Sequence, residues 1–178
     1  MPQAQETYTL DQLRDPSTRE RAFAAMVRAL SPVLYGHIRR IVQFHDDADD
    51  VLQNTFLKAW QALGSFRGEC SLSTWLYRIA VNESLAHLSR RREHGDLDAL
   101  GAQELAGDPY FDGDATELLL QEAISRLPGK QRVVFNLKYF EEMKYEEMSR
   151  VLGTSVGALK ASYHLAVKKV EAFFRERE

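Results

Sequence analysis

Residues 64–92, GSFRGECSLSTWLYRIAVNESLAHLSRRR, combine a glycine-containing loop, several aromatic side chains, one central asparagine and three consecutive arginines. An aromatic face can stack on a base that has left the duplex, an amide can bond to the Watson–Crick edge of that base, and arginines can hold the flanking phosphates. Together these residue types indicate a surface that binds unpaired DNA. Such binding requires no catalytic group.

Phe66 and Asn82 are the residues of this segment that packing explains least. Phe66 lies in the polar loop SFRGE, where an aromatic ring either folds back into the core or contacts a ligand. Asn82 lies in the middle of a helical stretch, although asparagine is a weak helix former. We predict that the two side chains form a pocket for one flipped base.

The other residues of the segment divide between packing and strand contact. Trp75, Leu76 and Ile79 have the spacing of core residues, so we predict that they are buried. The arginines that follow can hold the flanking strand, but such a run is also typical of a solvated helix end, and composition leaves both interpretations open. They are Arg90, Arg91 and Arg92.

A second DNA-binding pattern lies near the C-terminus. Residues 144–174 predict two helices joined by a short turn: KYEEMSRVL, then Gly153-Thr154-Ser155, then VGALKASYHLAVKKVEAFF. A glycine follows the first helix and a serine caps the second, which is the spacing of a helix-turn-helix. A plain helical hairpin is the alternative. We favour the helix-turn-helix, because a glycine turn and a capping serine in this register rarely coincide in an ordinary helical hairpin.

In a helix-turn-helix, the N-terminal part of the second helix enters the major groove of DNA. Lys160 can reach a guanine edge or a phosphate there, and His164 can donate or accept a hydrogen bond. The positions predicted to face DNA are Ser155, Gly157, Ala158, Lys160, Ala161, His164, Lys168 and Lys169. The predicted core positions are Val156, Leu159, Tyr163, Ala166, Val170 and Phe173. Because few of the DNA-facing side chains are long, we expect modest intrinsic affinity.

Helical periodicity also describes the first half of the chain. Residues 18–44 predict a helix interrupted near Ser31-Pro32, and a second helix begins at His45-Asp46-Asp47. Apolar residues at steps of three and four predict its buried face: Ala48, Val51, Leu52, Thr55, Phe56, Ala59, Trp60 and Leu63. The opposite face is predicted to be exposed: Asp50, Gln53, Asn54, Leu57, Lys58 and Gln61.

Charge divides the chain into parts. Residues 95–117 contain seven acids and no lysine or arginine, and removing these carboxylates from the net charge of −3 leaves +4 on the rest. Four glycines and a proline in the same segment indicate a linker. We predict an all-α protein with a tail (1–17), a first helical domain (18–94), an acidic linker (95–117) and a second helical domain with the helix-turn-helix (118–178).

Several function classes are disfavoured. No stretch approaches the roughly 18 apolar residues of a membrane helix, and the N-terminus is neither basic nor apolar, so we expect a cytoplasmic protein. The acids Asp46, Asp47, Asp49 and Asp50 resemble a calcium loop only partly, because Leu57 occupies the place of its distal glutamate. No HExxH, phosphate loop or nucleophile with a base is present. We therefore expect neither an enzyme nor a bound metal or cofactor.

Three motifs in order carry a family resemblance: DADDVLQNTFLKAW, then SFRGECSLSTWLYRIAVN, and, after the acidic linker, LPGKQRVVFNLKYFEEMKYEEMSRVLGTSVGALKASYHLAVKKV. They resemble an extracytoplasmic-function (ECF) sigma factor of bacterial RNA polymerase, from about residue 20 onward. The resemblance implies a sigma2 domain and a sigma4 domain that bind core polymerase and direct it to promoters.

The resemblance also implies roles for individual residues of sigma2. Phe66 and Asn82 correspond to the pocket for a flipped base of the −10 element, and the loop from Arg67 to Ser73 corresponds to a segment of variable base preference. Trp75, Tyr77 and Arg78 match the region that stabilises the opened strand. The residues that correspond to a contact with the clamp helices of the largest polymerase subunit are Asp50, Gln53, Asn54, Leu57 and Lys58. Asn54 stands where many relatives have a glutamate.

In sigma4, Lys160 stands where relatives often carry an arginine directed at the −35 element. Ala161, His164 and Leu165 replace polar or basic groups, which implies an altered −35 preference. The resemblance further implies that sigma4 contacts the flap of the second-largest subunit and that the acidic linker extends toward the active centre. Many relatives are held inactive by an anti-sigma factor, so such a partner is also an expectation.

The favoured hypothesis is a sigma factor that recognises both promoter elements and nucleates melting by capturing one extruded base. A stand-alone helix-turn-helix regulator is the second hypothesis, and it predicts tight duplex binding without polymerase. An adaptor that contacts only proteins is the third. The Phe66 loop and Asn82 distinguish the first from the second, because a reader of duplex DNA has no use for them.

Overall fold

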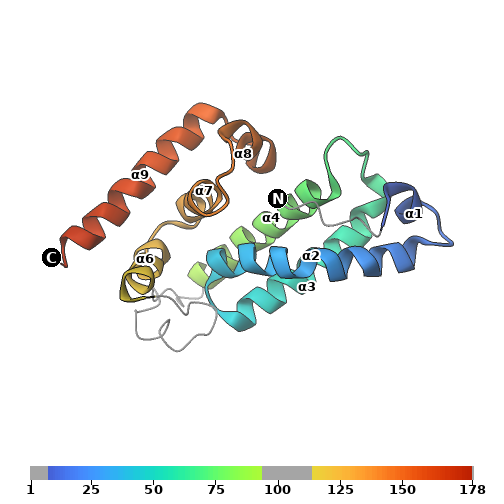
Figure 1. Ribbon diagram of the computed structural model, residues 1–178, viewed down its shortest axis with the longest axis horizontal. Coiled ribbons are helices and arrows are strands. Elements are labelled where there is room, and N and C mark those ends of the chain that lie inside the picture. The colour runs from blue at the N-terminus through green and yellow to red at the C-terminus, as the bar shows by residue number, and fades with distance from the viewer. Residues whose placement is uncertain (1–7, 94–113, 178) are drawn as a thin grey trace. The chain divides into compact units, whose positions relative to one another are not determined.

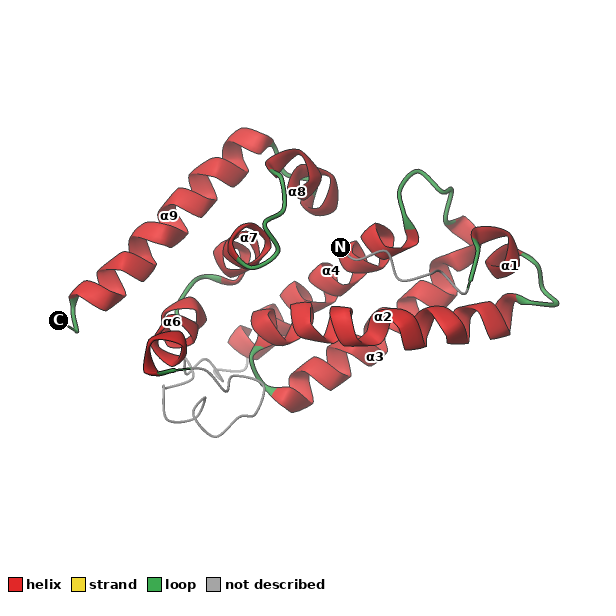
Figure 2. Cartoon of the chain, viewed as in Figure 1, coloured by secondary structure: helices red, strands yellow, loops and turns green. Residues whose placement is uncertain are grey.

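The computed structural model describes residues 8–93 and 114–177, without the side chains of Arg92 and Glu93 (Figure 1). These residues form helices and no strands, which confirms the predicted all-α class with two helical domains (Figure 2). The chain divides into two compact units, one ending at His87 and one beginning at Leu88. Residues 95–113 of the predicted acidic linker lie outside the described residues, whereas its last residues begin a helix.

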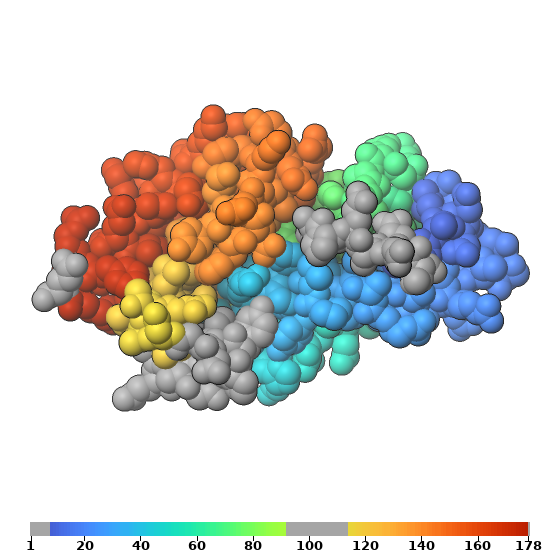
Figure 3. Space-filling view, in the orientation of Figure 1, coloured from blue at the N-terminus to red at the C-terminus, as the bar shows by residue number. Residues whose placement is uncertain are grey.

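The first unit contains α1 (Leu10–Arg14), α2 (Arg19–Val42), α3 (His45–Ala62), the short 3₁₀ helix η1 (Leu63–Ser65) and most of α4 (Leu72–Glu93). Its core is formed by apolar side chains at helical spacing on α2, α3 and α4, among them Met26, Ile38, Val51, Ala59 and Leu76. Residues 8–17 were predicted to be a tail. They include α1, which is held by a capping box between Thr9 and Gln12 and by the fully buried Leu13. In the space-filling view, α1 (dark blue) lies against the start of α2 (Figure 3).

The predicted interruption near Ser31-Pro32 is wrong, because α2 continues through Pro32. Proline has no N–H to donate to the carbonyl of Arg28, one turn earlier. The Ser31 hydroxyl donates to the carbonyl of Val27, the residue before Arg28, and so adds a side-chain hydrogen bond in the turn that lacks a backbone one. Packing of the residues on either side, including the buried Leu34 and Ile38, outweighs the local cost of the proline.

The predicted α3 stripe is buried at five of its eight positions, half-buried at Leu52 and Phe56, and partly exposed at Trp60. Ala48, Val51, Thr55, Ala59 and Leu63 are buried, but Trp60 is 41% exposed. The Trp60 ring packs edge-on against Phe23 of α2, with 5.0 Å between ring centroids. One face of the indole is therefore covered while the rest remains at the surface, a common outcome for the largest side chain at the border of a stripe.

The second unit contains α6 (Ala115–Ser125), α7 (Gly129–Tyr139), α8 (Tyr145–Leu152) and α9 (Val156–Arg175). Its core includes Ile124, Leu127, Phe135, Ala166 and Phe173. Asp114, at the end of the acidic segment, caps α6 by accepting a hydrogen bond from the Glu117 amide. Pro128 occupies the N-cap of α7.

The predicted helix-turn-helix is confirmed in its details. Gly153 ends α8 in the left-handed conformation, with φ of 63°, which glycine adopts without steric cost. The Ser155 hydroxyl caps α9 by accepting a hydrogen bond from the Ala158 amide at 3.2 Å. Leu159, Ala166, Val170 and Phe173 of the predicted core stripe are buried, and Val156 and Tyr163 are half-buried.

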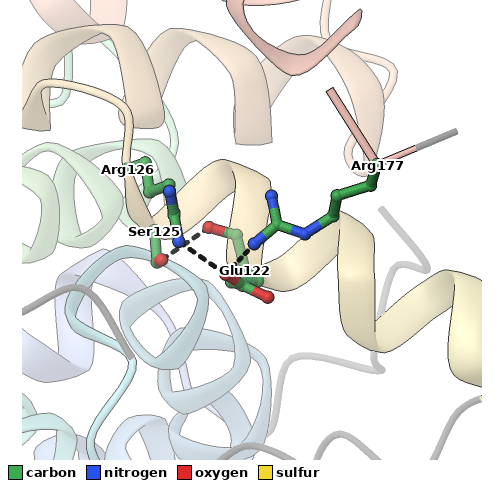
Figure 4. A network of polar contacts seen from close by, with 4 residues as sticks. All are labelled: Glu122, Ser125, Arg126 and Arg177. Carbon is green, nitrogen blue, oxygen red and sulfur yellow. Dashed lines mark hydrogen bonds and ion pairs between the residues drawn. The ribbon is translucent and has the colours of Figure 1, made fainter. Parts of the chain in front are cut away.

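A buried carboxylate joins the two ends of the second unit (Figure 4). Glu122 of α6 accepts hydrogen bonds from Arg126 at 2.7 Å and from Arg177 at 2.8 Å. The same two guanidinium groups lie over the Phe173 ring, at 5.0 and 3.8 Å from its centroid. Arg132 is also buried, which lowers its pKa to about 10, and it donates to the carbonyls of Ser125 and Leu127 beyond the end of α6.

We predict that Glu122→Gln lowers the free energy of unfolding of the second unit by about 1–2 kcal/mol, because a neutral amide forms weaker bonds to the two guanidinium groups. Both tryptophans, Trp60 and Trp75, lie in the first unit, so their fluorescence follows that unit alone. Urea unfolding should show a shifted circular-dichroism transition and an unshifted tryptophan transition.

Glu171→Gln is the matched control, because Glu171 is an exposed carboxylate on α9. Its effect should stay within about 0.5 kcal/mol. Equal shifts for the two variants would show that the Glu122 network contributes nothing specific.

Candidate nucleic-acid interfaces

The residues predicted for DNA contact in the helix-turn-helix lie on α9 and at its N-cap. Ser155, Gly157, Ala158, Lys160, Ala161, His164, Lys168 and Lys169 are all exposed. The neighbouring Leu165 is 49% exposed. Lys160, His164 and Lys168 on one face provide donors and positive charge for a polyanion, while the small residues permit a close approach. Lys169 lies outside this face and donates to Gln131 of α7.

Lys160 is held by a residue that the sequence did not indicate. Its ammonium lies over the ring of Tyr145, the first residue of α8, at 5.7 Å from the centroid. Lys138 of α7 approaches the same ring at 5.0 Å and donates to the carbonyl of Met143. These cation–π contacts restrict Lys160 near the N-terminal half of α9. Periodicity could not reveal them, because they join three different helices.

An aromatic stack supports α9 from behind. Phe135 of α7 packs against Tyr139 and Tyr163, with centroid distances of 5.2 and 5.9 Å. Burial raises the pKa of Tyr163, and the neighbouring Tyr145 and Tyr139 raise it further, so its phenol stays neutral at physiological pH. The stack fixes the middle of α9 without placing charge beneath the reading face.

The predicted base pocket is only partly assembled. Asn82 is exposed on α4, and Trp75 lies seven residues earlier on the same helical face, roughly 10 Å along the axis. Phe66 is buried, and its ring packs against Trp75 with 4.8 Å between centroids. Arg14 donates to the Phe66 carbonyl. Of the two possibilities that the sequence left open for Phe66, the structure shows the first: its ring folds back into the core. The Phe66 ring therefore supports Trp75 and offers little of its own surface to a base.

The other predicted strand contacts differ in exposure. Tyr77 is 3% exposed and packs edge-on against His37 at 4.6 Å, so the structure removes its ring from the surface that a strand can contact. Arg67, Arg78 and Arg90 are exposed, whereas Arg91 is half-buried. Of the predicted core residues, Leu76 is buried and Trp75 and Ile79 are half-buried. The Arg92 side chain lies outside the described residues.

The face of α3 opposite its core presents Asp50, Gln53, Asn54, Leu57 and Lys58, all exposed as predicted. Leu57 is 59% exposed, and Trp60 lies one turn further along the helix. An apolar pair surrounded by polar and charged side chains is typical of a protein interface.

Lys58 also connects this face to α4, through an ion pair that the sequence did not reveal. Its ammonium contacts the carboxylate of Glu83, whose side chain is 9% exposed. Glu83 follows Asn82 directly, but it points into the helix packing. Helical periodicity assigns Glu83 to the buried face of α4. Because a buried carboxylate requires a partner, this position could have indicated the ion pair from the sequence.

Within residues 8–93 and 114–177, no three histidine, cysteine, aspartate or glutamate side chains are grouped as metal ligands. None of the helices in these ranges is both long and apolar enough to span a membrane.

Two family models match the chain. The Sigma-70 region 2 model covers residues 26–94, and the Sigma-70, region 4 model covers residues 117–170. The first match contains the α3 and α4 surfaces, and the second contains the helix-turn-helix.

Curated relatives agree with these models. The chain is 32% identical over 165 residues to the RNA polymerase sigma-H factor of Pseudomonas aeruginosa, covering 85% of this chain and 86% of that protein. It is 33% identical over 138 residues to the ECF RNA polymerase sigma-E factor of Escherichia coli K12, covering 70% and 72%.

Two solved structures have a similar fold. The sigma factor RpoE of Bartonella quintana, solved with the anti-sigma factor NepR, has a TM-score of 0.68 and 25% identity, covering 87% of this chain and 98% of that one. CnrH, solved with the cytosolic domain of CnrY, has a TM-score of 0.66 and 25% identity, covering 96% and 100%.

We predict that Lys58→Met lowers the free energy of unfolding of the first unit by about 1 kcal/mol, because it leaves the Glu83 carboxylate buried without its cation. The double variant Lys58→Met with Glu83→Leu should recover most of that loss. Tryptophan fluorescence during urea unfolding measures these two variants and the single variant Glu83→Leu, which completes the cycle. Additive effects in this double-mutant cycle would mean that the ion pair is not energetically coupled.

Proposed function

The chain belongs to the sigma-70 family, in its ECF group, and on that premise we propose how it acts: it binds core RNA polymerase, recognises the −10 and −35 promoter elements and starts promoter melting. As a member of this family it is a DNA-binding factor for transcription initiation. The assignment of its individual residues to these steps is our proposal, as is its action in the cytoplasm.

The observation that carries the melting step is the exposure of Asn82 on α4. A mid-helix asparagine at the surface contributes nothing to packing, and its amide can both donate to and accept from the edge of a base. Arg78 lies one turn before it on the same helix, and Arg67 lies in the preceding loop; both are exposed. We assign Asn82 to the extruded −10 base and Arg67, Arg78 and Arg90 to the strand backbone.

Phe66 and Tyr77 have supporting roles in this proposal. Because Phe66 packs on Trp75, it fixes the start of α4 and with it one boundary of the base site. Tyr77 anchors the opposite side of α4 to α2 through His37. Both residues therefore position the helix that carries Asn82.

The α3 face is proposed to dock on the clamp helices of the largest polymerase subunit. Its centre is Leu57, and Asp50, Gln53, Asn54 and Lys58 provide the polar surroundings. The Lys58–Glu83 pair joins this face to α4, so a partner bound at α3 also holds the helix that presents Asn82.

The second unit is proposed to place α9 on the −35 element while it sits on the flap of the second-largest subunit. Of the two solved relatives, RpoE was solved with the anti-sigma factor NepR and CnrH with the cytosolic domain of CnrY. We propose that an anti-sigma factor also holds this chain inactive. Residues 95–113, which are acidic, are proposed to mimic RNA phosphates in a basic channel of polymerase.

We predict that Leu57→Ala weakens binding to core polymerase about tenfold, because burial of a leucine side chain against the partner contributes about 1.5–3 kcal/mol and alanine retains only a small part of it. Binding is measured by competition for core polymerase against the unmodified chain. Val33→Ala is the matched control, since Val33 is 41% exposed on α2 outside the proposed face. An equal loss in both variants, or initiation at no promoter by core polymerase with this chain, would refute the proposal.

We predict that Asn82→Ala reduces open-complex formation about tenfold while core polymerase binding changes less than about twofold. Permanganate reactivity of the −10 thymines measures opening. The defect should shrink on a template whose −10 segment is already unpaired, because no unstacking energy is then required. Parallel loss of polymerase binding and opening would argue that Asn82 has only a structural role.

A stand-alone regulator would give a different pattern. It would bind a duplex site tightly without polymerase, and neither Leu57→Ala nor Asn82→Ala would alter that binding.

A further inference from the structure

Leu165 is an exposed leucine in the middle of the DNA-reading face of α9. Its side chain is 49% exposed, although the rest of the large apolar side chains of α9 pack at least partly against the second unit. Full burial of a leucine stabilises a protein by about 1.5–3 kcal/mol, and folding covers only about half of Leu165. A partner that covers the other half would gain the rest of this free energy.

Leu165 belongs to a small apolar surface. Ala161 lies four residues before it and Ala158 seven residues before it, spacings that place the three side chains side by side along one stripe of the helix. All three are exposed. Lys160, His164 and Lys168 lie beside this stripe on the same outer face.

The reading face has few side chains that identify bases by hydrogen bonds, and Lys160 and His164 are its candidates. Residues 156–170 contain no arginine, asparagine, glutamine, aspartate or glutamate. Bidentate contacts of arginine to guanine and of asparagine or glutamine to adenine are therefore excluded for this part of α9. The feature of the major groove that an apolar surface can recognise is the C5-methyl group of thymine.

We propose that Leu165, together with Ala161 and Ala158, selects thymine methyl groups in the −35 element, while Lys160 and Lys168 hold the surrounding DNA. This inference rests on the proposed function and specifies its base preference. The occupant is DNA because the apolar stripe is flanked by exposed lysines and carries no carboxylate before Glu171. A protein ligand would have to be both acidic and apolar to fit the same face.

The test begins with the holoenzyme, formed from core polymerase and the full chain. Promoters with a randomised −35 region are selected by the holoenzyme, and each thymine of the enriched element is then replaced by deoxyuridine. This replacement removes the methyl group alone and leaves the hydrogen-bonding edge of the base unchanged. We expect at least one position to lose about fourfold in affinity, the factor that corresponds to one methyl-sized group leaving contact.

The same duplexes are measured with two variants of the chain. Leu165→Ala should abolish the difference between thymine and deoxyuridine at the sensitive position. Leu165→Met should retain it, because methionine preserves an apolar side chain of similar volume. Both variants should bind core polymerase as the unmodified chain does.

Four outcomes would overturn the inference. Equal affinity for thymine and deoxyuridine at every position would do so while leaving the proposed function intact. A methyl effect that persists in Leu165→Ala would assign the recognition to another residue. Loss of core polymerase binding in Leu165→Ala, without a change in base preference, would identify Leu165 as a protein contact. Failure of the unmodified holoenzyme to select any promoter would refute the proposed function itself, and the inference with it.

Discussion

The burial of one face of each functional helix fixes the direction of its other face, and this constraint governs both units. In α9, Leu159, Ala166, Val170 and Phe173 anchor the helix to its unit. The rotation of the helix is thereby set, so Lys160, Ala161 and Leu165 must all face outward. In α4, burial of Leu76, Ala80 and Ser84 sets the rotation of the helix, so Asn82 faces outward. A rigid helix presents side chains more reproducibly than a loop, which suits recognition of a base edge.

Helical periodicity and turn chemistry were sufficient to predict most of these directions. The spacing of apolar residues assigned the two faces of α3 and α9, and Gly153 with Ser155 located the turn, because a left-handed residue and a cap are local requirements. Pro32 shows the limit of local reasoning. A proline disfavours the helix that contains it, but Met26 before Pro32 and Leu34 and Ile38 after it are buried in the first unit, and tertiary packing prevailed.

Side-chain contacts between different helices could not be predicted from the sequence. Trp60 has the correct phase for burial yet remains 41% exposed, with its ring packed against Phe23 of α2. Tyr77 was expected at the DNA surface but packs against His37, since the rotation of α4 is decided by its neighbours rather than by composition. The Tyr145–Lys160 contact and the Lys58–Glu83 pair join residues 15 and 25 positions apart, a separation at which no periodic pattern carries information.

The composition of α9 also bears on why such a chain would require a larger partner. Its outer face offers Lys160, His164, Lys168 and an apolar stripe, so it can contribute salt-sensitive phosphate contacts, single hydrogen bonds to bases and a few methyl contacts. Binding of that kind, in isolation, lies near the weak range of non-specific DNA binding, about 10⁻⁴–10⁻⁶ M. If core polymerase holds the first unit at the −10 element, the second unit encounters its own site at an effective concentration that can reach the millimolar range, and weak contacts then suffice. Under the proposed function, a weak reading helix would also keep the free chain from occupying promoters, because occupancy would depend on the polymerase that supplies the remaining affinity.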